Sequence, residues 1–480
     1  MTSNSNMRPL LFIATLLLLP FSESALCAEI RIDCAKEIGT VRALNGINGG
    51  PIENQGLIDL SAYHRQLKVP LTRLHDCNWP VADCIDIHTI FPNFNADPAL
   101  PENYDFTRTD AYIKSVLAIG SGIVYRLGEN IEHGLDKRYS RPPADSAKWA
   151  QICIGIIAHY NDGWANGRHD NIRYWEIWNE PENRPNCWSG SDEDYFKLYA
   201  AASKAIKARF PDIKVGGPAV GNTGRVENGV FTPSQFTSKF IDYCKRESLP
   251  LDFFSWHIYT DDPRDVLIEA KGVRDLLDRA GFNKVESHLN EWNYLPEKDW
   301  GPVVKEGQGE KREKFYARAG GVEGAAFVAC VLGGLQDIPI DAANFFSGNS
   351  QSFGLFNVHG VPKKTFYAFK AFASLLETPV RLQASGDVAG RLGICAGTKS
   401  DHSEVRVMLS NFSNQAEKLN LVLEHLPWEG ESKYEMLVVD VGDNGDNSHI
   451  GRLETGHHAI ELPISAYSVV VLKIHRADSK

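Results

Sequence analysis

Two glutamates in matching surroundings are the strongest candidates for chemistry in this sequence. Glu180 lies in WNE (178–180) and Glu291 in NEW (290–292), so each follows an asparagine and has a tryptophan close by. Cleaving a glycosidic bond needs such a pair: one carboxylic acid protonates the departing oxygen, and a second carboxylate attacks or stabilises the sugar carbon. The long segment between the two glutamates must therefore fold so that both carboxyl groups reach one site.

Polar residues near the ends of other predicted strands are expected to support this pair. Asn179 is expected to bond the sugar 2-hydroxyl, where hydrogen bonds strengthen in the transition state. His257 and Tyr259 are expected to hold the second carboxylate. His75 is placed to bond a sugar hydroxyl, with a structural pairing to Asp76 as the alternative.

Two more side chains are expected to contact the substrate. Trp292 offers an apolar face on which a sugar ring could stack, although a tryptophan taken alone is more often part of a core. Glu129 is expected either as a third carboxylate in the pocket or as the partner of Arg126.

The elements that must position these residues follow an alternating pattern. Between residues 41 and 375, short β-like runs alternate with amphipathic helical stretches, which predicts a (β/α)8 TIM barrel. In such a barrel the active site lies at the C-terminal ends of the strands, which is where the polar residues fall. The eight predicted strand regions are 42–49, 70–76, 122–129, 171–180, 213–221, 252–260, 285–293 and 342–348.

The stretch IRYWEIWNEPEN (172–183) holds three glutamates with different expected roles. Glu176 shares strand parity with Glu180, so it should point into the barrel, where Arg73 is its expected cation. Glu182 lies beyond a proline and is expected at the rim or in solvent. Asn179 and Glu180 are consecutive, so both can serve one sugar only if the backbone there twists or bulges.

The residues before and after the predicted barrel have different sequence patterns from the barrel itself. Residues 376–480 carry strand patterns separated by turn residues, which predicts an all-β sandwich domain, and the strand-like segment 29–40 is expected to join it. Residues 1–28 resemble a secretory signal peptide, with the short apolar run 10–20 after Arg8. The sequence thus predicts a secreted or periplasmic protein, with lipid anchoring at Cys27 as the alternative.

Several other classes of protein fit poorly. The net charge of −11 and the lack of a Lys/Arg block argue against nucleic-acid binding. We find no second stretch that reads as a membrane span. GxSxG and HExxH are absent, so a serine hydrolase or a zinc protease is not expected. Export permits disulfides, and Cys77 with Cys84 is the best candidate pair.

Four stretches resemble glycoside hydrolase family 39 of clan A, which contains β-xylosidases and α-L-iduronidases. They are IWNEPEN (177–183), SWHIYT (255–260), LNEWN (289–293) and FGLFNVHGVPKKTFYAFKAF (353–372). The resemblance implies a TIM barrel with a β-sandwich, Glu180 as general acid/base and Glu291 as nucleophile. It implies a retaining mechanism through a covalent glycosyl-enzyme, without metal or cofactor. It further implies substrate or support roles for Asn179, His75, His257 and Tyr259.

We therefore expect an exported retaining glycosidase that removes terminal sugars from a glycoside or oligosaccharide, with β-xylosidase-like specificity. The alternatives are an α-L-iduronidase-like or other exo-acting enzyme, an endo-acting clan A glycanase, and a non-catalytic carbohydrate-binding protein. A uronide substrate would need a basic group, for which Arg126 and Lys305 are candidates. Since the acid must stay protonated while the nucleophile is ionised, a bell-shaped pH profile is expected.

Overall fold

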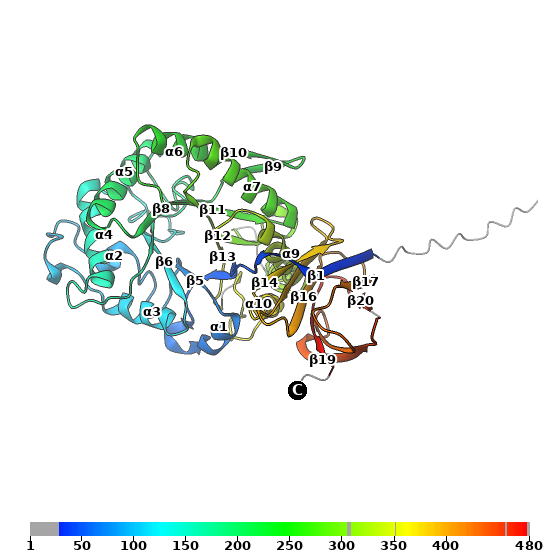
Figure 1. Cartoon of the computed structure of the whole chain (residues 1–480). Helices are drawn as coiled ribbons and strands as arrows, with labels where there is room; N and C mark the ends of the chain where they lie inside the picture. The colour runs from blue at the N-terminus through cyan, green and yellow to red at the C-terminus, as the bar shows by residue number, and fades with distance from the viewer. Residues whose placement is uncertain (1–27, 305–308, 351, 457, 478–480) are drawn as a thin grey trace, which may run out of the picture.

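The computed structural model describes residues 28–304, 309–350, 352–456 and 458–477. These residues form a barrel with an all-β domain at its side (Figure 1). The predicted signal segment with Cys27 lies outside the described residues, apart from Ala28, and so does Lys305.

In the described part of the chain, eight parallel strands close into a barrel in the order β11-β12-β13-β2-β5-β6-β7-β8. Each of the eight predicted runs overlaps one of them, so the predicted (β/α)8 fold is confirmed. The strands are β2 (Gly46–Asn48), β5 (Leu71–Leu74), β6 (Gly122–Leu127), β7 (Tyr174–Ile177), β8 (Lys214–Val220), β11 (Phe253–Thr260), β12 (Glu286–Tyr294) and β13 (Ala342–Phe345).

Helices surround the barrel, and local sequence sets several of their ends. Ser191 and Asp194 form a capping box at the start of α5, and Gly281 ends α7 with a left-handed φ of 90°. The helices are α1 (Ser61–Leu67), α2 (Ile87–Ile90), α3 (Thr107–Leu117), α4 (Ser146–Asn161), α5 (Asp192–Arg209), α6 (Gln235–Arg246), α7 (Pro263–Ala280), α8 (Gly309–Gly320), α9 (Val322–Gly334) and α10 (Lys364–Leu375). Two short hairpins, β3–β4 (Ile52–Glu53, Ile58–Asp59) and β9–β10 (Gly224–Glu227, Val230–Pro233), lie in loops.

Helix α9 joins the two parts of the molecule. It packs against α10 and β12 on one side and against strands of the all-β domain on the other. The helical stretch Gly309–Asp337 has the length and apolar composition of a membrane span, yet 72% of its apolar window is buried inside the protein. Its apolar character is therefore accounted for by its place in the core.

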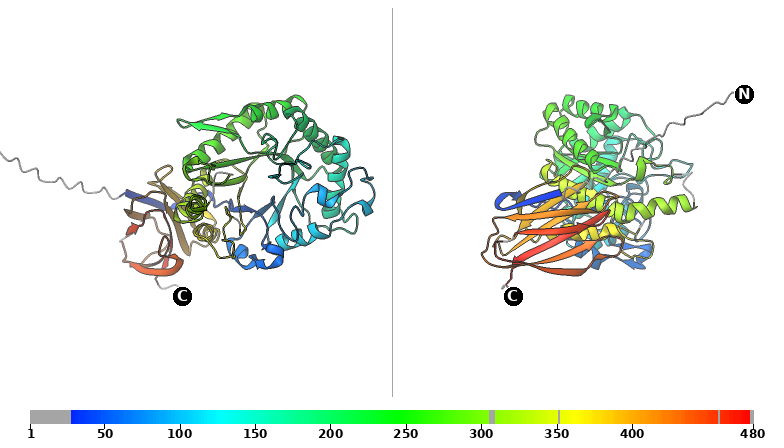
Figure 2. Two further views of the ribbon diagram at one scale, coloured as in Figure 1. Left: turned by 180° about the vertical axis from the view of Figure 1, so that it is seen from behind. Right: turned by 90° about the vertical axis from the view of Figure 1, so that its right-hand side faces the viewer.

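The all-β domain contains nine described strands in one hydrogen-bonded sheet, in the order β19-β18-β21-β16-β15-β14-β1-β17-β20. Both edge strands contribute to the same apolar cluster, through Leu453 and through Ile460 and Leu462, so this sheet curls around a core of its own (Figure 2). The strands are β1 (Ala28–Thr40), β14 (Val380–Ser385), β15 (Leu392–Thr398), β16 (Glu404–Asn411), β17 (Glu417–Glu424), β18 (Ser432–Val439), β19 (Asn444–Leu453), β20 (Ala459–Ile464) and β21 (Ser468–Arg476).

Strand β1 precedes the barrel in the chain but lies inside this sheet. It pairs antiparallel with β14 and parallel with β17. The chain thus enters the barrel from the all-β domain and returns to it afterwards.

The described cysteines are all buried free thiols. The predicted disulfide between Cys77 and Cys84 is therefore not formed in this structure. Instead, the Cys84 thiol donates to the carbonyl oxygen of Trp79 at 3.0 Å.

Candidate active site

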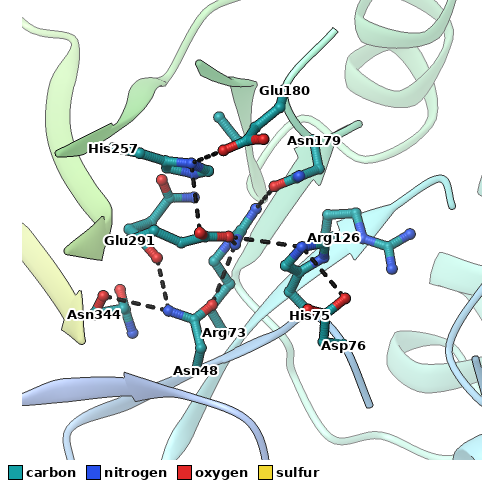
Figure 3. A network of polar contacts seen from close by, with 12 residues as sticks. Asn48, Arg73, His75, Asp76, Arg126, Asn179, Glu180, His257, Glu291 and Asn344 are labelled. Atoms are coloured by element: carbon teal, nitrogen blue, oxygen red, sulfur yellow. Dashed lines mark hydrogen bonds and ion pairs between the residues drawn. The ribbon is translucent and has the colours of Figure 1, made fainter. Parts of the chain in front are cut away.

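Glu180 and Glu291 meet at the C-terminal end of the barrel strands, with His257 between them (Figure 3). One ligand atom from each of the three residues lies within 4.8 Å of the others. Their side chains are nearly buried: 17% of Glu180 and 6% of Glu291 remains exposed, and none of His257. The two carboxyl groups therefore share one small, largely water-excluded space.

The backbone leaves strand geometry just before Glu180. Strand β7 ends at Ile177, and the next residues include Trp178 with a φ of 73° and Glu180 with a φ of 45°. This break lets the consecutive side chains of Asn179 and Glu180 join the same polar network. The expected departure from regular strand geometry is confirmed.

A second irregularity lies in β12. Its register with β11 pairs Trp256 with Leu289 but His257 with Glu291, so Asn290 is an extra residue. Because of this bulge, the side chains of both Asn290 and Glu291 point into the barrel, where Asn290 donates to Glu176. In each consecutive Asn-Glu pair, both side chains reach the site only because the regular strand geometry is broken locally.

Arg73 on β5 donates hydrogen bonds to several of the polar side chains at this site. It is fully buried, and it carries the net positive charge that the surrounding carboxylates need. Burial lowers the pKa of Arg73, but Glu176 and Glu291 raise it more, so the guanidinium stays charged. Nε donates to Glu176 at 2.7 Å, Nη1 to Glu291 at 2.7 Å and to Asn48 at 3.2 Å, and Nη2 to Asn179 at 2.6 Å.

Replacement of Arg73 by methionine is expected to lower the free energy of unfolding by about 3–5 kcal/mol, because it leaves Glu176 and Glu291 buried without their cation. Urea denaturation followed by circular dichroism measures this loss. Arg225→Met is the matched control, since its side chain is 68% exposed, and it should shift stability by less than about 0.5 kcal/mol. Equal stability of both variants would show that Arg73 does not hold the network together.

Glu180 is held by donors on one side of the pocket. His257 Nδ1 lies 2.8 Å from Oε1, and Asn183 Nδ2 donates to Oε2 at 2.9 Å. The Cys187 thiol lies 3.7 Å from the same Oε2. Burial raises the pKa of Glu180, but the bonds from His257 and Asn183 lower it more, so the net pKa is below its ordinary value.

His257 therefore has a different partner from the expected one. It was predicted to hold the second carboxylate, but its Nδ1 is 3.6 Å from Glu291 and within hydrogen-bonding distance only of Glu180. Burial lowers the pKa of His257, and the two glutamates raise it more, so its net pKa lies above the ordinary value. Glu180 and His257 therefore form a hydrogen-bonded pair.

Glu291 is held by other groups. Tyr259 donates its hydroxyl to Oε2 at 2.8 Å, and Arg73 donates to Oε1. Burial, followed by the charge of Glu291, raises the pKa of Tyr259 well above its ordinary value, so the phenol keeps its proton and remains a donor. His75 Nε2 lies 3.7 Å from Oε1, at the edge of this set.

Glu182 is not the solvent carboxylate that its position after Pro181 suggested. Oε1 accepts the backbone N–H of Asn222 at 2.7 Å, and Oε2 is buried with no partner among the described residues. Burial and the nearby Glu180 raise the pKa of Glu182 to about 7. The loop after β8 folds over this side chain, which the local sequence pattern does not reveal.

Trp292 lies away from the pocket. It is fully buried, and its ring packs against those of Phe345 and Phe369 on the outer side of the barrel. Strand parity explains this placement, because the neighbouring Glu291 points inward. The structure thus assigns Trp292 to the core rather than to a sugar-stacking face.

Glu129 and Arg126 do not pair with each other. Glu129 Oε2 lies 2.5 Å from His88 Nδ1, whereas Arg126 Nη2 donates to Asp86 at 2.6 Å and also to Asn130. Burial raises the pKa of Glu129 to about 7 despite His88. The expected Arg126–Glu129 pair is therefore corrected to Glu129–His88 and Arg126–Asp86.

Within the described part of the chain, two sets of side chains bring metal-ligand atoms close together: Glu180, His257 and Glu291, and Asp86, His88 and Glu129. In each set an arginine already balances a carboxylate. Arg73 bonds Glu291 in the first set, and Arg126 bonds Asp86 in the second. Arg73 also bonds Glu176, so its single positive charge is shared by two carboxylates at the first set.

Some contributors to the site were missed from the sequence. Arg73 was expected only as the cation of Glu176, although its position two residues before His75 places both on the same face of a strand. Asn183 and Cys187 lie in the loop after Pro181, where no periodic pattern indicates which side chains turn back toward Glu180.

The chain is similar in sequence to known glycoside hydrolases. The sequence model described as "Glycosyl hydrolases family 39" matches residues 81–300, which include both glutamates. A β-xylosidase of Geobacillus stearothermophilus is 26% identical over 319 residues, covering 60% of this chain and 59% of that protein. The chain thus spans well under two thirds of that relative.

Two solved structures share the architecture over nearly the whole chain. A glucosidase from Croceicoccus marinus matches with a TM-score of 0.78 at 25% identity, over 95% of this chain and 100% of the other. A monomeric β-xylosidase from Caulobacter crescentus CB15 matches with a TM-score of 0.67 at 18% identity, over 93% and 99%. The second likeness concerns the fold alone.

Proposed function

Since the chain belongs to glycosyl hydrolase family 39, we propose that it releases a terminal sugar from glycosides with retention of configuration, and that a β-xyloside is its preferred substrate. The observation that carries this proposal is the approach of the Glu180 and Glu291 carboxyl oxygens to within 4.8 Å. Retaining enzymes keep their carboxyl groups about 5–5.5 Å apart, whereas inverting enzymes need about 6.5–9.5 Å to admit a water molecule.

The surroundings of the two carboxyl groups support different roles. Glu291, bonded by Arg73 and Tyr259, attacks the anomeric carbon as a carboxylate and forms a glycosyl ester while the bond to the leaving oxygen breaks. Glu180 gives that oxygen a proton. Water then hydrolyses the ester, and Glu180 takes a proton from it, which returns both side chains to their starting states.

The proton needed in the first step is held by the Glu180–His257 pair. Before substrate binds, the shifted pKa values of the two side chains favour the proton on His257 Nδ1. Transfer over the 2.8 Å contact to Glu180 makes it available to the leaving oxygen. The pair then accepts the proton of the attacking water in the second step.

The preference for a xyloside rests on the relatives described as β-xylosidases. A uronide substrate is less well supported, because Arg126, one of the two cations expected as candidates to bind it, already donates to Asp86 and Asn130. We also propose export, on the evidence of the signal-like residues 1–28.

Hydrolysis of a panel of 4-nitrophenyl glycosides tests this function. We expect the β-xyloside to give the highest kcat/KM, ahead of the arabinoside, glucoside, fucoside and iduronide. Proton NMR of the reaction should show β-xylose as the first sugar formed. α-Xylose as the first product would contradict the retaining mechanism, and a folded protein that cleaves no panel member would contradict the proposed activity.

A further inference from the structure

Asp76 is a carboxylate at this site for which the mechanism above has no role. It is the second residue after β5, and its φ of 50° is left-handed, a conformation uncommon for residues other than glycine. Its side chain is 26% exposed, more than that of either proposed catalytic glutamate. Among the described residues, no hydrogen-bond donor is found for its carboxyl oxygens.

The surrounding loop fixes this strained conformation. The backbone N–H of Asp76 donates to Oδ1 of Asn130 at 3.2 Å. Asn130 is in turn held by Asp86, which accepts its N–H at 2.7 Å, and by Asp83, which accepts from its Nδ2 at 2.6 Å. A strained backbone persists where its surroundings determine it, and such strain clusters at functional sites.

Asp76, His75 and Glu291 face a common space (Figure 3). His75 Nε2 lies 3.6 Å from Oδ1 of Asp76 and 3.7 Å from Oε1 of Glu291. Both distances exceed the length of a direct hydrogen bond. Burial lowers the pKa of His75 well below its ordinary value, so the neutral ring offers one N–H and one lone pair. A hydroxyl entering this space could accept from His75 and donate to Asp76.

We propose that Asp76 is a specificity-determining residue that accepts a hydrogen bond from the 3- or 4-hydroxyl of the terminal sugar. It thereby makes the site selective for neutral sugars over uronides. This inference rests on the proposed function, since it assumes that a sugar occupies the pocket beside Glu291. The sugar 2-hydroxyl would bond to Asn179 instead, which reaches the pocket from the end of a different strand.

The charges around Asp76 support the exclusion of an anionic sugar. Of the charged groups that act on Asp76, Glu291 has the largest effect, and the nearby Arg126 and Arg73 each offset it only in part. Burial, followed by the charge of Glu291, raises the pKa of Asp76 to about 7. A uronate group bound here would place its negative charge close to Asp76 and Glu291.

Steady-state kinetics with Asp76→Ala and Asp76→Asn test this inference. For 4-nitrophenyl β-xyloside we expect Asp76→Ala to lower kcat/KM by about 10- to 100-fold, the effect of losing one hydrogen bond to a charged group. On the 3-deoxy or the 4-deoxy xyloside the same change should have little effect. Asp76→Asn should raise the rate on 4-nitrophenyl β-glucuronide relative to the xyloside by about 10-fold or more. Asp97→Asn, an exposed aspartate of the following loop, is the control and should match wild type.

Equilibrium binding separates this inference from the proposed activity. By calorimetry, wild type should bind xylose more tightly than glucuronate, and Asp76→Ala should lose that preference. If no aryl glycoside is cleaved but wild type still prefers xylose, the proposed enzymatic activity is wrong and the inference about Asp76 stands. The inference would be overturned if Asp76→Ala lost the same factor of kcat/KM on the xyloside and on both deoxy analogues. It would also be overturned if wild type cleaved glucuronide and xyloside equally well.

Discussion

Replacement of Glu291 by glutamine is expected to lower kcat on 4-nitrophenyl β-xyloside by about 10⁴-fold or more, because the amide cannot form the glycosyl ester. The amide keeps the size of the side chain, and its one carbonyl oxygen can still accept from either Arg73 or Tyr259. The fold should therefore survive while the chemistry is lost. Release of nitrophenol, followed at high enzyme concentration, measures the residual rate.

The matched control for this change is Glu247→Gln, an exposed side chain beside Arg246 on the protein surface. It should leave kcat within a factor of about two. A Glu291→Gln variant that kept more than a tenth of the wild-type rate would exclude Glu291 as the nucleophile. Contamination is checked by treating the preparation with a mechanism-based fluorinated xyloside, which should label wild type at Glu291 and leave the variant unlabelled.

Replacement of Glu180 by glutamine should give a loss that depends on the leaving group. For an alkyl xyloside, whose oxygen needs a proton, we expect kcat/KM to fall by about 10²- to 10⁴-fold. For a 2,4-dinitrophenyl xyloside, which departs as a stable anion, the first step should change little. The glycosyl-enzyme should then accumulate, because the second step has lost its base, and intact-protein mass spectrometry would detect one added sugar.

The pH dependence gives an independent test of the same side chain. In wild type, the Glu180–His257 pair must hold a proton, and the pKa of His257 is raised above its ordinary value of about 6.5. Activity should therefore fall as the pH rises through a value above 6.5. With the dinitrophenyl substrate, Glu180→Gln should lack this descending limb. A variant with the same limb and the same loss on both leaving groups would argue against Glu180 as the acid/base.

The repeating pattern of the barrel could be predicted because it is local. Each strand region is a short apolar run followed by polar residues, and the C-terminal ends of parallel strands meet by construction. The pattern therefore predicts Glu180 and Glu291 at one end of the barrel. The pairing of Glu176 with Arg73 followed from strand parity alone, and the structure confirms it.

What could not be predicted depends on contacts between distant segments. The bulge at Asn290 is defined by register against β11, which the sequence of β12 does not specify. His257 bonds Glu180 rather than Glu291, and Glu182 is covered by Asn222, because loops from other strands set those distances. The single curled sheet follows from the order in which nine strands pair, which strand propensity does not contain.

The position of β1 has a consequence for how the chain folds. Its hydrogen-bond partners are residues 380–385 and 419–424, so the first described strand has no sheet to join until most of the chain has been synthesised. Contacts of such sequence separation carry a large loop-closure entropy and slow folding. We therefore expect β1 to stay unpaired during synthesis while the barrel forms. We expect it to take its place between β14 and β17 late in folding, where it connects the start of the barrel to its end.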